Sequence, residues 1–144
     1  MNSRPPTAVG PPTGGRADES MATPDITFVD AADLIAVLDR TAPDHALAGH
    51  LWQFQFDIGG TFLTTDYAVV KATLELHRRY GVAGVRDLLE QVVPALRVEY
   101  CTEADLAMGA AALLSAGDDD GDLVDGVDEG VRRRLRVSSR LRIT

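Results

Sequence analysis

Three aspartates are placed so that they could act together on one metal ion. Asp30 ends the short apolar run 26–29, and Asp122 and Asp125 open a later segment with helical periodicity. Residues three apart on a helix share a side, so these two carboxylates face the same way. Carboxylate oxygens are the ligands that Mg²⁺ and Mn²⁺ prefer. We therefore predict that folding brings Asp30 to Asp122 and Asp125, and that the three form a metal site.

The same aspartates also have ordinary structural explanations. Asp30 directly precedes a helix-like segment, where aspartate commonly caps the free N–H groups of the first turn. Seven acids between residues 118 and 129 would by themselves be typical of a solvated loop. An EF-hand is excluded because alignment on Gly121 places Ala116 and Val127 at two ligand positions. On the residues alone, capping and metal binding both stay open.

The segments that would position these acids alternate between strands and helices. This alternation predicts a parallel α/β sheet covered on both faces, with its functional edge at the carboxyl ends of the strands. A glycine, Gly81, is expected to end the third helix, and Pro94 to stop the fourth. The expected strands are 26–29, 61–64 and 96–100; the expected helices are 31–38, 45–56, 66–80, 83–93, one starting at Thr102 and one opening at Asp122.

Length and composition predict one domain without a disulfide. The 144 residues are 45% hydrophobic, which suffices for one core, and the net charge of −8 argues against a general nucleic-acid coat protein. The single cysteine, Cys101, cannot form an internal disulfide, which suits a reducing cytoplasm. Residues 1–24 are rich in Pro and Gly and are predicted to be a disordered extension, with Met21 a candidate start; 25–144 is the expected domain. No apolar run is long enough to span a membrane.

Basic residues occur at two places that matter for the acids. Lys71 shares one side of the expected helix 66–80 with Tyr67, Val70 and Leu74, where a lysine stem often lies along apolar surface. Segment 130–144 contains six arginines and no acid. Arginines late in a helix complement its dipole, or they can form a path for RNA phosphates. The candidates for RNA contact are Arg132, Arg133 and Arg136.

The expected helix 45–56 has more large apolar residues than one buried stripe needs. We predict that the surplus covers a partner, either a second copy of the chain or a helix of another protein. The residues concerned are Leu47, Leu51, Trp52, Phe54 and Phe56.

Taken in order, segments 28–36, 64–70 with the ending 78–81, and 122–125 resemble the PIN domain, particularly the VapC-type toxins of type II toxin–antitoxin systems. The resemblance covers about residues 25–144. It implies a three-layer α/β/α sandwich with a central, mostly parallel sheet whose last strand is incomplete. It also implies a cytoplasmic endoribonuclease of single-stranded RNA, often dimeric and inhibited by a cognate antitoxin, that uses Mg²⁺ or Mn²⁺. The catalytic and metal-binding residues would be Asp30, Asp122 and Asp125.

The sequence departs from this family pattern at two places. Lys71 stands where the family has a glutamate, and no residue can be matched to a fourth acid after segment 140–144. These departures favour the alternative of a catalytically degenerate PIN domain that binds RNA or a protein partner without cleavage. We predict that the Lys71 ammonium lies beside the acids, that cleavage is weak or absent, and that Lys71→Glu increases Mg²⁺ affinity and activity.

Overall fold

The computed structural model describes residues 25–118 and 121–141; the extension predicted for 1–24 lies outside these residues. Strands and helices alternate as the sequence predicts. Among the described residues, no helix is both long and apolar enough to cross a membrane. The elements are β1 (Ile26–Phe28), α2 (Ala31–Leu38), α3 (His45–Asp57), β2 (Thr61–Thr65), α4 (Asp66–Asp87), η2 (Leu88–Val92), η3 (Val93–Ala95), β3 (Arg97–Glu99), α5 (Glu103–Ala116) and α6 (Leu123–Leu135).

The three strands form one parallel sheet in the order β1-β2-β3. After α6 the chain returns to the free edge of β1, where Arg140 forms an isolated parallel bridge with Phe28. The Phe28 N–H donates to the Ser139 carbonyl at 2.8 Å, and the Leu141 N–H donates to the Phe28 carbonyl at 3.0 Å. The expected last strand therefore begins here as a single bridge, and residues 142–144 lie outside the described part.

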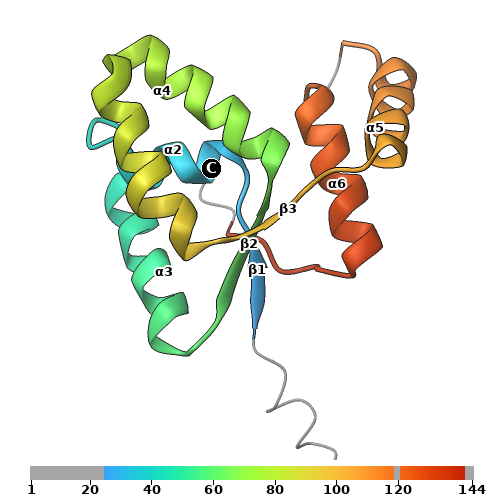
Figure 1. Cartoon of the computed structure of the whole chain (residues 1–144). Helices are drawn as coiled ribbons and strands as arrows, with labels where there is room; N and C mark the ends of the chain where they lie inside the picture. Colours follow the sequence, from blue (N-terminus) through green and yellow to red (C-terminus); the bar gives the residue numbers. More distant parts are fainter. Residues whose placement is uncertain (1–24, 119–120, 142–144) are drawn as a thin grey trace, which may run out of the picture.

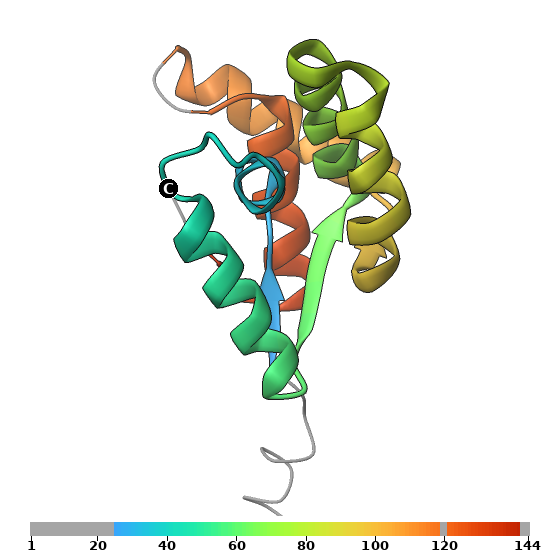
Figure 2. The same cartoon turned by 90° about the vertical axis from the view of Figure 1, so that its left-hand side faces the viewer.

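Helices cover both faces of the sheet, with α2, α3 and α4 on one side and α5 and α6 on the other (Figures 1 and 2). Successive strand residues point to opposite faces, so neighbouring side chains enter different cores. Val29 and Phe62 pack with Leu34 and Leu76 on the first face, whereas Phe28 and Leu63 pack with Val137 on the second; the smaller third cluster joins α2 to α3. This arrangement is the predicted α/β/α sandwich.

α4 spans Asp66–Asp87, but a non-helical residue divides it at the predicted stop. Gly81 has a φ of 70° and a ψ of −159°, a conformation open to glycine because it lacks a Cβ. The chain therefore forms two helical segments that meet at a kink, as expected for helices 66–80 and 83–93, and the second segment passes through a π-helical turn into the short 3₁₀ helix at Pro94.

Two glycines allow α5 and α6 to pack at close range. A Cβ on Gly109 of α5 would lie 2.5 Å from the side chain of Val127 and 2.9 Å from its nitrogen, and a Cβ on Gly126 would lie 3.0 Å from the Gly109 carbonyl oxygen. Arg134 of α6 further donates to both carboxylate oxygens of Asp105, at 3.1 and 2.8 Å. These contacts hold α6, which carries the acidic pair, in a defined position beside the sheet.

Candidate functional site

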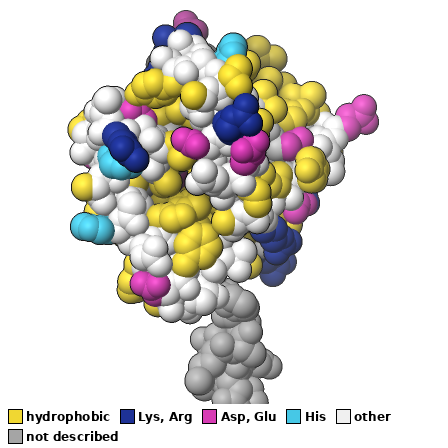
Figure 3. Space-filling model, turned by 60° about the vertical axis from the view of Figure 1, so that its left-hand side comes forward, with side chains coloured by type: hydrophobic (Ala, Val, Ile, Leu, Met, Phe, Trp, Pro, Cys, Tyr) yellow, Lys and Arg dark blue, Asp and Glu magenta, His cyan; other side chains and the backbone are white. Residues whose placement is uncertain are grey.

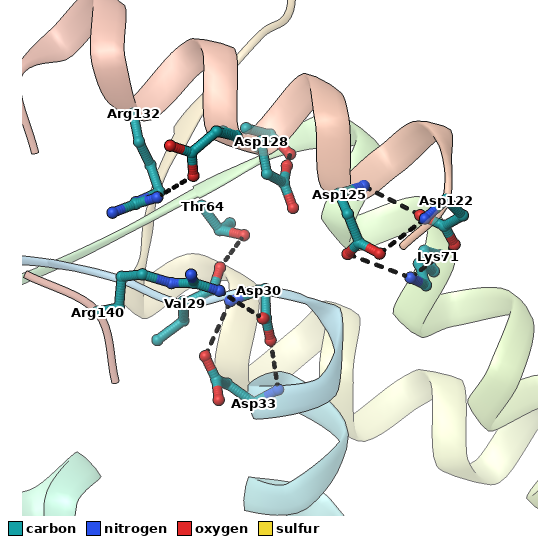
Figure 4. A network of polar contacts seen from close by, with 12 residues as sticks. Val29, Asp30, Asp33, Thr64, Lys71, Asp122, Asp125, Asp128, Arg132 and Arg140 are labelled. Carbon is teal, nitrogen blue, oxygen red and sulfur yellow. Dashed lines mark hydrogen bonds and ion pairs between the residues drawn. The ribbon is translucent and has the colours of Figure 1, made fainter. Parts of the chain in front are cut away.

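Asp30 caps α2, as its position before a helix suggests. Its Oδ1 accepts from the Asp33 N–H at 2.9 Å, and Asp33 returns a bond from its carboxylate to the Asp30 N–H at 3.1 Å. The other oxygen, Oδ2, lies 3.5 Å from the Arg140 guanidinium (Figure 4). The capping explanation is therefore confirmed, and only one oxygen of Asp30 is left for contacts outside α2.

Asp122 and Asp125 form a second capping box at the start of α6. Asp122 Oδ1 accepts from the Asp125 N–H at 3.0 Å, and Asp125 Oδ2 accepts from the Asp122 N–H at 2.9 Å. Their remaining oxygens face Lys71 of α4, whose Nζ lies 2.8 Å from Asp122 Oδ2 and 3.7 Å from Asp125 Oδ1 (Figure 4). Lys71 thus lies beside the acids, as we predicted.

The electrostatics of this contact keep it charged. Partial burial lowers the pKa of Lys71, but the hydrogen bond to Asp122 and the nearby carboxylates outweigh it, so the pKa lies above its usual value. Burial likewise raises the pKa of Asp122, but Lys71 and the Asp125 N–H lower it to a net value below the usual range. Lys71 and Asp122 therefore form an ion pair at neutral pH.

A fourth acid, Asp128, lies one turn after Asp125 and was not among the predicted site residues. Asp128 is 5% exposed; its Oδ1 accepts from the Thr65 hydroxyl at 2.6 Å, and its Oδ2 has no hydrogen-bond partner among the described residues. Burial, together with the charges of Asp30 and Asp125, raises the pKa of Asp128 to about 7 against the Thr65 hydrogen bond. Its position between Val124 and Val131 on the apolar side of α6 was the available signal.

All four acids line an open pocket of about 340 Å³ beside β1. They also form the wall of a second, more apolar pocket of about 750 Å³ between α2 and α4, to which Tyr67, Val70, Lys71 and Leu74 contribute. Asp30, Asp122 and Asp125 therefore line the same pockets. Three separate elements supply the groups: the N-cap of α2, α4 and the first turns of α6.

The donor atoms have the right chemistry for Mg²⁺ or Mn²⁺, but their arrangement does not fit such an ion. Within residues 25–118 and 121–141, no three His, Cys, Asp or Glu side chains are grouped closely enough to hold a metal. Lys71 takes the free oxygens of the acidic pair, and Arg140 approaches the free oxygen of Asp30. Cations of the chain itself therefore contact the oxygens that a metal would need.

The three predicted RNA-binding arginines lie at different distances from this pocket. Arg132 lines it, and its side chain is mostly buried against Glu129 and the Phe28 ring. Arg133 and Arg136 lie further along, around a separate hollow after α6; Arg133 pairs with Glu129 at 3.3 Å, and Arg136 caps α6 with a φ of 59°. Their contact with RNA stays a prediction.

Comparisons with known proteins support the fold. No family model matches the chain, and no curated protein sequence does. The structure is similar to the crystal structure of Mycobacterium tuberculosis VapC20, a sarcin–ricin loop cleaving toxin, with a TM-score of 0.65 and 20% sequence identity. The match covers 81% of this chain and 87% of that one. The fold that the sequence resemblance implies is thus confirmed: the chain has an α/β fold similar to that of VapC20.

Proposed function

We propose that this chain is a VapC-type PIN domain that binds single-stranded RNA and, as written, cleaves it weakly or not at all. The observation that carries the proposal is the Lys71 ammonium held between Asp122 and Asp125 in the acid-lined pocket. Arg132 and Arg140 line the adjacent pocket beside β1, which shares its aspartates with the pocket that Lys71 lines, and guanidinium groups there can pair with RNA phosphates. RNA binding is therefore supported by the basic rim, and weak cleavage by the cation inside.

Charge explains why Lys71 should weaken metal-dependent cleavage. Two unit charges 4 Å apart interact by about 4 kcal/mol at an effective dielectric constant near 20, and exposure to water reduces this value. A divalent ion beside the acidic pair would be repelled by the ammonium and would have to compete with it for the same oxygens. Both effects oppose Mg²⁺ binding.

A second candidate is an active Mg²⁺- or Mn²⁺-dependent endoribonuclease, the toxin component of a toxin–antitoxin system. The four aspartates that line one pocket favour it, as does the similarity to VapC20, a toxin that cleaves the sarcin–ricin loop. In this candidate Asp30, Asp122 and Asp125 are the catalytic residues, and the site has to rearrange before it can bind a metal.

Cleavage and binding assays on the same RNA separate the two candidates. Fluorescence anisotropy in EDTA measures binding of a labelled single-stranded RNA, and gel electrophoresis measures its cleavage in Mg²⁺ or Mn²⁺. We expect salt-dependent binding, little cleavage by the unmodified protein and a gain of cleavage in Lys71→Glu. Robust cleavage by the unmodified protein that Asp30→Asn abolishes would establish the second candidate. Absence of RNA binding would contradict the proposal.

The partners that we propose are a cognate antitoxin and a second copy of the chain, in the cytoplasm. Trp52 stacks on Phe62 with ring centroids 4.3 Å apart, so it belongs to the protein's own core. Leu47, Phe54 and Ile58 are nevertheless 49%, 60% and 47% exposed. Figure 3, in which the side of the molecule with α2, α3 and α4 comes forward, shows hydrophobic side chains gathered on this face. Size-exclusion chromatography with light scattering tests the dimer; a monomer alone would leave the antitoxin as the partner of α3.

A further inference from the structure

The chain contains thirteen arginines and a single lysine, and that lysine lies in the acid-lined pocket. A lysine ammonium is a compact charge with three donors on a flexible stem, whereas the arginine guanidinium is a planar fork. Because it is compact, the Lys71 ammonium can contact two carboxylates at the start of α6 at once. Its Nζ lies 2.8 Å from Asp122 and 3.7 Å from Asp125. Its side chain is 38% exposed, so the contact is accessible to ions from solvent.

A second cation approaches the same group of acids from another element. Arg140 lies in the segment that returns to the edge of β1, and its Nη2 is 3.5 Å from Asp30 Oδ2. Lys71 and Arg140 therefore contact three of the four acids. The fourth, Asp128, is buried and lines both pockets, and its Oδ2 has no hydrogen-bond partner among the described residues.

We propose that Lys71 and Arg140 are resident counter-ions that pair with the free oxygens of Asp30, Asp122 and Asp125 and exclude Mg²⁺ and Mn²⁺. The ammonium of Lys71 joins α4 to the start of α6, and the guanidinium of Arg140 joins the last described segment to Asp30. The proposal deepens the non-cleaving function and rests on the same site. Metal exclusion is tested in experiments that contain no RNA. A failure of metal exclusion can therefore be distinguished from a failure of RNA binding.

Of the two cations, Lys71 should oppose metal binding more strongly. It touches two acids, one of them at 2.8 Å, whereas Arg140 touches one acid at the limit of an ion pair. Replacing Lys71 by glutamate would remove the positive charge and add a carboxylate on α4. Asp128 lines the same pocket as Lys71.

Direct titration with Mn²⁺, followed by electron paramagnetic resonance of the free ion, tests the exclusion. We expect no saturable binding to the unmodified protein, detectable binding to Lys71→Met, and at least about tenfold tighter binding to Lys71→Glu than to the unmodified protein. Arg86→Met and Arg86→Glu make the same charge changes on α4, at an exposed residue that pairs with Glu90. Equal gains in the Arg86 controls, or saturable Mn²⁺ binding to the unmodified protein as tight as to Lys71→Glu, would overturn the proposal.

The single lysine allows a second test on the unmodified sequence, which does not depend on the variants folding. Reductive methylation with ¹³C-formaldehyde labels only Lys71 and the α-amino group and preserves the positive charge. We expect the Lys71 methyl resonance to resist paramagnetic broadening by Mn²⁺. A resonance that broadens at low Mn²⁺ would overturn the proposal.

Discussion

α4 holds carboxylates in opposite ways near its kink and near its first turns. Near its kink, Asp39 is 3% exposed and accepts from the Thr41 hydroxyl at 2.6 Å, the Tyr80 hydroxyl at 2.6 Å and Arg79 at 2.8 Å. In the acid-lined pocket, the Lys71 pairs are about half exposed, and one oxygen of Asp128 has no partner among the described residues.

The difference separates a structural network from a candidate site. Asp39 has donors on both oxygens and joins the end of α2 to α4, so no ligand is needed to satisfy it. The pocket gathers four aspartates and leaves Asp128 Oδ2 without a hydrogen-bond partner among the described residues, which costs free energy in the folded state. Incomplete hydrogen bonding beside an open pocket is typical of functional sites, which makes this pocket the candidate.

The largest expected effect is loss of stability when the Asp39 network is broken. Asp39→Ala leaves the Tyr80 and Thr41 hydroxyls and one Arg79 contact without their acceptor, so we expect a larger fall in the free energy of unfolding than for any variant below. Urea denaturation followed by circular dichroism measures it. A variant as stable as the unmodified protein would show that the network is no more structural than the pocket.

The same network should make stability sensitive to acid. The hydrogen bonds from Thr41 and Tyr80, with Arg79, hold the pKa of Asp39 well below its usual range. A lowered pKa in the folded state adds stability above the unfolded pKa of about 4, and this stability is lost as the pH falls through the folded value. We expect Asp39→Asn to reduce the loss of stability below about pH 4, as measured by denaturation across that range.

Asp128 should behave in the opposite sense. Its raised pKa, about 7, means that its contribution is fully present below the unfolded pKa of about 4 and is lost as the pH rises to 7. Asp128→Asn keeps an acceptor for Thr65 without the charge, so we expect a gain on the order of 2–4 kcal/mol at pH 8 and little change at pH 4. A loss of stability at pH 8 would show that the buried charge is compensated.

Lys71→Met should have a smaller effect on stability, because its ion pairs are about half exposed. We expect a loss of about 0.5–1 kcal/mol at low salt that shrinks as salt is added. Added Mn²⁺ should restore stability to this variant more than to Arg86→Met. A loss as large as that of Asp39→Ala would place Lys71 in a structural network.

Arg140→Gln should change stability least. Its contact with Asp30 is long, at 3.5 Å, and exposed, so we expect a loss below about 0.5 kcal/mol. The backbone bridge to Phe28 does not involve the side chain and should persist. A larger loss in thermal denaturation would mean that the guanidinium helps to hold the returning segment on β1.

Local patterns predicted most of the elements because the forces involved are local. Asp30, Asp122 and Thr102 each cap the helix that follows, since a capping side chain needs only the N–H groups of the next turn. The alternation of strands and helices predicted the parallel sheet. Gly81 was correctly placed at a break, but the helix resumes beyond it because one residue with positive φ changes the direction of α4 without ending its packing.

The pocket itself depended on contacts between distant segments. The sequence periodicity predicted that Lys71 lies on one side of a helix and that Asp122 and Asp125 face the same way. That these groups meet was predicted only from the family resemblance. The burial of Asp128 followed from the close packing of α5 and α6 at Gly109 and from the hydroxyl of Thr65, 63 positions away. The position of Arg140 beside β1 likewise depends on hydrogen bonds between distant segments of the chain. Residue types determined which groups could carry charge, and packing decided which charges meet, because burial and distance, not sequence spacing, set the strength of an ion pair.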